Sequence, residues 1–191
     1  MSSQWVLVQP STALTALVGL PETALPVRQA RVDAIFKSQT SRIELCDLVD
    51  ELEVFAGEEP DAIARLTPSM ALLARAAIGE LLWENQWERA ETYARLARRW
   101  SPNDTPLLVQ LGRALHGLGR HSEATTQWQS AIARARAAEQ WSPMLWLLTA
   151  RSLMEQDQFD EAALLVDEIS VRCADDAVEN LRLALDQKRT R

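Results

Sequence analysis

A repeat of 34 residues is the feature that most constrains the fold of this 191-residue chain. Residues 71–104 and 105–138 superimpose without a gap, and the same pattern returns at residues 143–176. The positions that recur are, in the second copy, Leu111, Gly112, Leu115, Gly119, Ala124, Trp128 and Ala131. A fixed period of this length is typical of stacked helical hairpins. We therefore expect three hairpins, with about one extra helical turn between the second and the third.

The composition also favours an all-α fold. The chain has only six glycines and eight prolines, and they cluster between segments of helical periodicity. Alternating β-branched residues, which indicate strands, are nearly absent after the first ten residues. Because 47% of the residues are hydrophobic, the chain has the apolar content of a folded domain.

The sequence predicts an N-terminal arm, a pair of helices and a repeat array. The arm covers residues 1–26, and the helices in 27–68 are either a degenerate repeat or an N-terminal cap. The array covers 69–191. It contains hairpins at 71–104, 105–138 and 143–176, followed by a capping helix at 176–189.

Turn-forming and capping residues set the expected helix boundaries. In the array, the expected pairs are Ser69–Glu84 with Trp87–Trp100, Thr105–Leu118 with His121–Gln140, and Pro143–Gln156 with Phe159–Arg172. Upstream, Ser41 is expected to cap a helix that ends at Gly57, and a short helix should follow from Glu58 to about Leu66. Asp175 is expected to cap the last helix.

The array resembles the tetratricopeptide repeat over about residues 71–176. In that family, small residues let the two helices of a hairpin approach closely, and here Gly112 and Ala124 occupy those places. A large residue such as Trp128 packs into the next hairpin, and a proline such as Pro102 ends the unit. The resemblance implies an all-α solenoid, a right-handed superhelix of antiparallel helical hairpins.

The same resemblance implies a partner-binding groove lined by the first helix of each hairpin. The groove residues that it implies are Leu72, Arg75, Leu82 and Trp83 in the first copy, Val109, Arg113 and His116 in the second, and Met144, Leu147, Arg151 and Met154 in the third. An apolar floor with three arginines suits a peptide that carries apolar anchors and acidic groups. Alternatively, some of these residues contact the N-terminal arm or the capping helix.

Individual aromatic, histidine and cysteine side chains give further expectations. Trp83 and Trp141 lie outside the repeated packing positions, so we expect them to be exposed. His121 is expected to pack between helices, where the family has an aromatic residue. Cys46 and Cys173 lie in apolar helical patterns and are expected to be buried free thiols.

Charge and motif content argue against several other functions. A net charge of −7 disfavours nucleic-acid binding, which needs a basic face. No run of 18 apolar residues predicts a membrane span, and the N-terminus lacks the features of a secretory signal, so we expect a cytoplasmic protein. His116 and His121 are the only histidines, and their spacing indicates no metal cluster. We expect no catalytic residues, no metal and no cofactor.

The leading interpretation is therefore a non-enzymatic scaffold or adaptor that binds a peptide or a partner protein. A more specific alternative is a bacterial secretion chaperone, because the layout of Asp104–Ala131 is similar to the central repeat of class II type III secretion chaperones. A third interpretation is self-assembly into a homo-oligomer, in which the apolar N-terminal arm docks on a neighbouring molecule.

Overall fold

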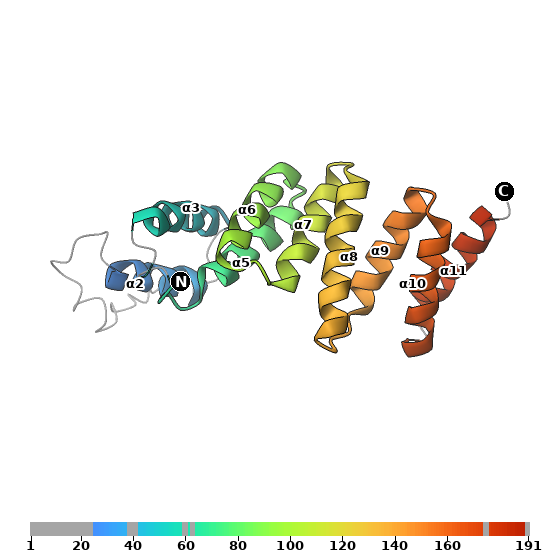
Figure 1. The fold of residues 1–191 in the computed structure, drawn as a ribbon. Helices are drawn as coiled ribbons and strands as arrows, with labels where there is room; N and C mark the ends of the chain where they lie inside the picture. Colours follow the sequence, from blue (N-terminus) through green and yellow to red (C-terminus); the bar gives the residue numbers. More distant parts are fainter. Residues whose placement is uncertain (1–24, 38–41, 59–60, 62–63, 174–175, 190–191) are drawn as a thin grey trace, which may run out of the picture. The chain divides into compact units, whose positions relative to one another are not determined.

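The computed structural model describes residues 25–37, 42–58, 61, 64–173 and 176–189, and these form helices joined by short turns (Figure 1). The helices are α2 (Leu25–Lys37), α3 (Arg42–Glu58), α5 (Met70–Trp83), α6 (Trp87–Trp100), α7 (Thr105–Gly117), α8 (His121–Ala137), α9 (Pro143–Glu155), α10 (Phe159–Arg172) and α11 (Asp176–Arg189). The described ranges contain no strand, which confirms the predicted all-α class. Within those ranges, no helix combines the length and the apolar character that a membrane crossing requires.

The chain divides into two compact units, residues 1–73 and 74–191. In the first unit, α2 contacts α3, and Val32, Leu48 and Leu52 are buried. Arg28 is 8% exposed and forms an ion pair with Glu51 across the two helices at 3.4 Å. This unit therefore has a small core of its own with an ion pair at its edge.

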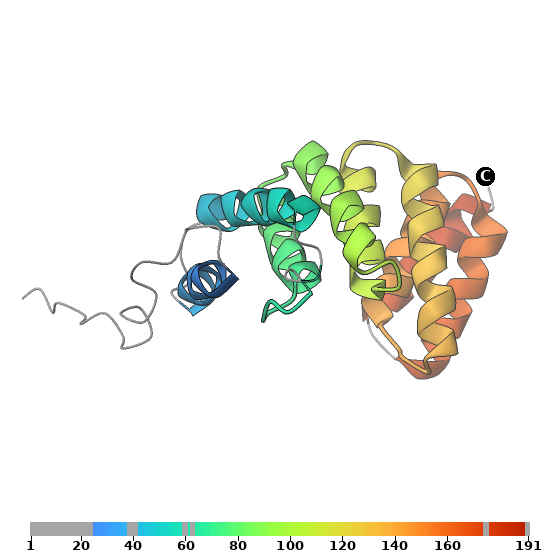
Figure 2. The same ribbon diagram turned by 60° about the vertical axis from the view of Figure 1, so that its left-hand side comes forward.

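From α6 onward, the second unit is a succession of helices in which each contacts the next (Figures 1 and 2). Contacts join α6 to α7, α7 to α8, α8 to α9, α9 to α10 and α10 to α11, and α11 also reaches α9. The buried side chains form a continuous apolar series that includes Trp128 and Trp146, both almost fully buried. Burial of large aromatic side chains contributes strongly to the stability of such a core.

The three hairpin turns of this unit share one backbone geometry. Asn85, Gly119 and Asp157 have φ angles of 58°, 74° and 59°, in the left-handed region that closes a helix. The residue after each donates its backbone N–H to a carbonyl five residues earlier, for example from Arg120 to Leu115 at 2.9 Å. Asn and Asp tolerate this conformation better than most residues, so the turns keep their shape where glycine is absent.

Proline and aspartate begin the central helices where the sequence predicts. The Asp104 side chain accepts a hydrogen bond from the backbone N–H of Leu107 at 3.2 Å, and Pro106 occupies the first turn of α7. Pro143 likewise occupies the first turn of α9. Such residues satisfy or remove N–H groups that have no partner inside the helix. The extra turn is also present, because α8 has 17 residues and α6 has 14.

Several predicted boundaries need correction. The helix α3 continues through Gly57 to Glu58, so this glycine does not end it. Ala64 lies in a turn and Leu66 outside any helix, so no helix extends to Leu66. The first helices of the hairpins end one residue earlier than expected, and α8 ends three residues earlier, because the left-handed turn begins there. Residues 1–24 of the predicted arm, Ser41 and Asp175 lie outside the described residues.

Candidate functional site

Helices α7 and α9 lie side by side in the second unit, because residues at both ends of α7 lie close to residues of α9. At the C-terminal ends, His116 Nε2 lies 2.9 Å from Glu155 Oε2. At the N-terminal ends, Thr105 of α7 and Leu145 of α9 line the same pocket. The two helices therefore run in the same direction, and together they present one face.

A pocket of about 410 Å³ lies at the N-terminal end of this face. It is lined by Thr105, Pro106 and Val109 of α7, Ala135 of α8, Leu145 of α9, and Gln140, Trp141 and Ser142 between α8 and α9. Three of the lining residues come from the segment that follows the extra turn of α8. The departure from the 34-residue period therefore helps to build the pocket.

Trp141 is half-buried beside this pocket, although the sequence predicts an exposed side chain. Its ring centroid lies 4.4 Å from that of Trp146, and the guanidinium of Arg172 lies 4.6 Å from the Trp141 ring. The indole is therefore held between an aromatic and a cationic side chain. The indole therefore offers an apolar wall beside the pocket.

Most of the predicted groove residues of the second unit reach the surface. Trp83 is 77% exposed and Met144 is 64% exposed. The other residues that are exposed or partly exposed are Arg75, Val109, Arg113, His116, Leu147 and Arg151. Leu72 is 40% exposed, but it belongs to the first unit. The predicted role of these residues in partner binding stays a prediction.

Leu82 and Met154 require a correction, because both are buried, with exposed fractions of 3% and 5%. They occupy equivalent positions in the first and third hairpins, at the last turn of the first helix. In these two hairpins the side chain points into the packed interior rather than out of the groove. Neither residue is therefore available at the surface, and both stabilise the core by burying apolar area.

The three predicted groove arginines differ in their surroundings. Arg75 forms an ion pair with Asp104 at 3.5 Å, so its charge is partly neutralised within the chain. Arg113 and Arg151 are exposed, and the described part of the chain provides no ion-pair partner for either. Each lies about one helical turn from the His116–Glu155 contact. Two unpaired cations therefore lie on the face of α7 and α9.

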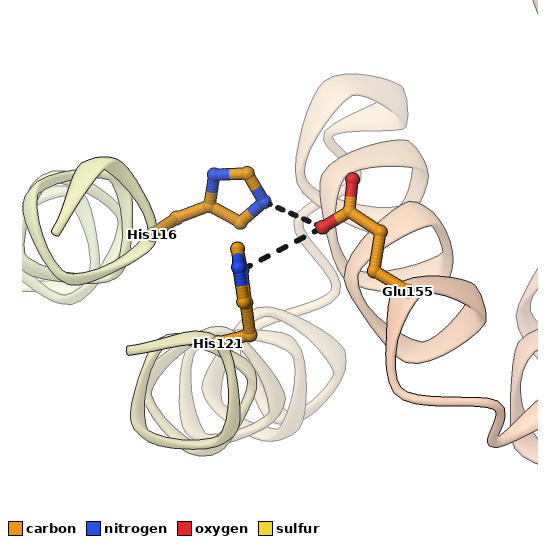
Figure 3. Close-up of side chains that lie close together, drawn as sticks. All are labelled: His116, His121 and Glu155. Atoms are coloured by element: carbon orange, nitrogen blue, oxygen red, sulfur yellow. Dashed lines mark hydrogen bonds and ion pairs between the residues drawn. The ribbon is translucent and has the colours of Figure 1, made fainter. Parts of the chain in front are cut away.

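Three side chains with metal-binding chemistry meet at the C-terminal end of the same face (Figure 3). His116 ends α7 and His121 begins α8, and both rings approach the same oxygen of Glu155 from α9. The His121 Nδ1–Glu155 Oε2 distance is 3.6 Å. Spacing in the sequence does not reveal this cluster, because Glu155 comes from the next hairpin. The only sign of the cluster in the sequence is that its two histidines lie on either side of a tight turn.

A second charged cluster lies on α6 and α8. Arg120, just before α8, donates hydrogen bonds to both carboxylate oxygens of Glu91 at 2.8 and 2.7 Å and to Glu123 at 2.6 Å. The hydrogen bond to Glu123 raises the pKa of Arg120 above its ordinary value and lowers that of Glu123. Because Glu91 lies on α6 and Arg120 precedes α8, the cluster links the first hairpin to the second. Its charges neutralise one another, so it leaves little free charge for a ligand.

Comparison with known proteins provides no family assignment for this chain. No family model matches the sequence, and a search of curated proteins finds no significant match. The described residues define an all-α protein built of consecutive helices joined by short turns.

Proposed function

We propose that this protein is a non-enzymatic protein-interaction module that binds a segment of a partner along the face of α7 and α9. The observation that carries the proposal is the combination of the pocket of about 410 Å³ and the two unpaired arginines on the same face. Concave apolar pockets with a few polar groups around them are the usual form of a ligand site.

The proposed partner segment has an apolar side chain that fills the pocket and an acidic residue that pairs with Arg113. Val109 lines the pocket, and Arg113 follows it by one helical turn, about 6 Å along the helix axis. An extended peptide rises about 3.3 Å per residue, so the acidic residue lies about two positions from the apolar anchor. Arg151 offers a second charge-assisted contact from α9.

We further propose that α5 to α11 form a tetratricopeptide-like solenoid that ends in α11. The three hairpin turns, each with a residue at positive φ and the same backbone hydrogen bond, are consistent with a repeated unit, although the turn at Glu139 between α8 and α9 has this geometry too. The succession of contacts from each helix to the next between α6 and α11 supports stacking. In a solenoid of this kind, the first helices of successive hairpins line one continuous surface, as α7 and α9 do here.

Affinity capture with a charge-reversed variant tests this function. The wild-type chain and the variant Arg113→Glu/Arg151→Glu are used to capture partners from the source organism, followed by mass spectrometry. A matched control, Arg89→Glu/Arg134→Glu, makes the same change in net charge on α6 and α8. Circular dichroism and the melting temperature of all three proteins establish that they fold equally.

We expect the wild-type chain and the control to retain the same partner and the α7/α9 variant to lose it. Charge reversal replaces attraction with repulsion toward the acidic residue of the partner. Equal capture by all three proteins would place the binding surface elsewhere. Self-association through the N-terminal arm stays an alternative; its residues 1–24 lie outside the described residues.

A further inference from the structure

We propose that His116, His121 and Glu155 form a zinc-binding site that joins the ends of three helices. This inference goes beyond partner binding and does not depend on it. Imidazole nitrogen and carboxylate oxygen are ordinary zinc ligands, and two histidines with one glutamate leave a fourth position for water. His116, His121 and Glu155 are 35%, 40% and 40% exposed, so this position is open to solvent.

The carboxylate oxygen of Glu155 already lies at nearly the distance from each histidine nitrogen that a zinc site requires. Zinc bonds of about 2.0–2.2 Å place neighbouring atoms of a tetrahedral site about 3.4 Å apart. The distances from Glu155 Oε2 are 2.9 Å to His116 Nε2 and 3.6 Å to His121 Nδ1. One ligand atom from each of the three residues lies within 4.8 Å of the others. The two distances from the Glu155 oxygen therefore lie within about 0.5 Å of the tetrahedral spacing, and the nitrogens of the two histidines lie no more than 4.8 Å apart.

His121 shows why a simple His–Glu hydrogen bond is not a sufficient account of the cluster. His116 Nε2 is within hydrogen-bond distance of the carboxylate. His121 Nδ1 is a buried atom with no hydrogen-bond partner among the described residues, although it points at the same oxygen (Figure 3). Buried polar atoms without partners are uncommon and costly. A metal ion among the three atoms would give this nitrogen a partner.

The repeat itself provides an internal comparison. At the position of His116, the first and third hairpins have Leu82 and Met154. At the position of His121, they have the aromatic residues Trp87 and Phe159. The fold therefore needs only apolar packing at both positions. The central hairpin replaces both apolar residues with histidine, and the neighbouring α9 supplies a carboxylate at the same place.

The test uses the full chain carrying Cys46→Ser and Cys173→Ser, which removes thiols as competing zinc ligands. Zinc chloride is titrated at neutral pH, where imidazole is available to bind metal. Binding is measured by calorimetry, and the imidazole resonances are followed by nitrogen-15 NMR. Because the chain has only two histidines, comparison with a variant that lacks one of them assigns each resonance.

We expect one zinc ion per chain, and we expect both imidazoles to respond in the same step. The variant His116→Met/His121→Phe carries the residues of the third hairpin, so it should fold, and it should lose zinc binding. Glu155→Gln should weaken zinc binding. Glu88→Gln should leave zinc binding unchanged, because Glu88 is an exposed residue of α6. Binding of zinc should also raise the melting temperature of the wild-type chain.

Three results would overturn the proposal. The first is the absence of zinc binding to the cysteine-free chain. The second is binding that persists in the histidine double variant. The third is a response of only one imidazole, which would indicate weak surface association. If the double variant does not fold, the NMR response of the wild-type histidines and the effect of Glu155→Gln still decide the question.

Discussion

The indole ring of Trp128 occupies the space where a side chain at Gly112 would begin. An ideal Cβ on Gly112 would lie 2.2 Å from Trp128 Nε1, and this nitrogen donates a hydrogen bond to the Val109 carbonyl at 3.1 Å. The ring is 1% exposed. The absence of a Cβ on α7 therefore allows the largest side chain of α8 to lie directly against the helix backbone.

In the other two hairpins, different pairs of residues fill the space that Gly112 and Trp128 occupy in the second. The positions equivalent to Gly112 and Trp128 are Ile78 and Ala94 in the first hairpin and Ala150 and Val166 in the third. All four of these residues are 0–1% exposed. In each hairpin a larger residue on one helix accompanies a smaller one on the other, so both positions are filled although the sequences differ.

The first prediction is that Gly112→Ala destabilises the protein. The new methyl group would overlap the Trp128 ring, and overpacking of this kind costs about 1–3 kcal/mol. Thermal and urea unfolding measure the change. Gly79→Ala is the control. A Cβ on Gly79 meets only Gln110 Nε2, at 3.7 Å, so this change should be neutral or stabilising by up to about 1 kcal/mol. Equal stability of the two variants would contradict the packing account.

The second prediction concerns a buried hydroxyl pair between α8 and α9. Thr125 Oγ1 donates to Ser152 Oγ at 2.9 Å and accepts from Gln156 Nε2 at 2.7 Å. Thr125→Val should lower the free energy of unfolding by about 1–3 kcal/mol, because buried polar groups lose a partner. The exposed neighbour Thr126 is the control, and Thr126→Val should change it by less than about 0.5 kcal/mol. Similar effects of both changes would show that the buried pair adds no stability.

The third prediction is a pH dependence of stability at Glu168. The hydrogen bond from Arg136 of α8 lowers the pKa of Glu168 below its ordinary value of 4.5. The folded state therefore favours the ionised carboxylate. The stabilisation is fully present above the unfolded-state pKa, and it disappears as the pH falls through the lower folded-state pKa.

The unfolding free energies of Glu168→Gln and of the wild-type chain are compared at steps between pH 3 and pH 7. Ion pairs of this kind typically contribute about 0.5–1 kcal/mol to stability. The difference in unfolding free energy should be largest near neutral pH and should shrink in acid. Glu179→Gln on α11 serves as the control, since Glu179 is exposed. A difference that stays constant with pH would show that the ion pair contributes nothing.

The fourth prediction tests the pocket directly. Ser142 lines the pocket, is exposed and makes no side-chain capping bond at the start of α9. Ser142→Trp should fill the pocket and reduce partner capture, with a change in stability below about 0.5 kcal/mol. Ser122→Trp places the same side chain at an exposed position of α8 and should leave partner capture unchanged. Undiminished capture by Ser142→Trp would exclude the pocket as the anchor site.

Helix positions were largely predictable from the sequence, because local rules set them. Asp104 and Pro143 mark helix starts through capping and a fixed φ angle, and these signals lie within a few residues of one another. Gly57 misplaced the end of its helix by one residue, because α3 ends at Glu58. The left-handed turns at Asn85 and Asp157 show that the turn geometry persists without glycine.

The candidate site was less predictable, because it depends on contacts between hairpins. Periodicity places Met154 on the first helix of a hairpin, but only packing shows that it is buried. The meeting of His116 with Glu155 depends on how α7 and α9 lie, which no spacing of 34 residues reveals. Trp141 likewise becomes a pocket wall through contacts with Trp146 and Arg172.

The central claim is that a partner binds along α7 and α9. Hydrogen–deuterium exchange of the full chain, alone and with the captured partner, tests it most directly. We predict that added protection will be concentrated in Thr105–Gly117 and Pro143–Glu155, with little change in Trp87–Trp100 and Phe159–Arg172. Protection confined to α6 and α10, with none in α7 and α9, would contradict the account.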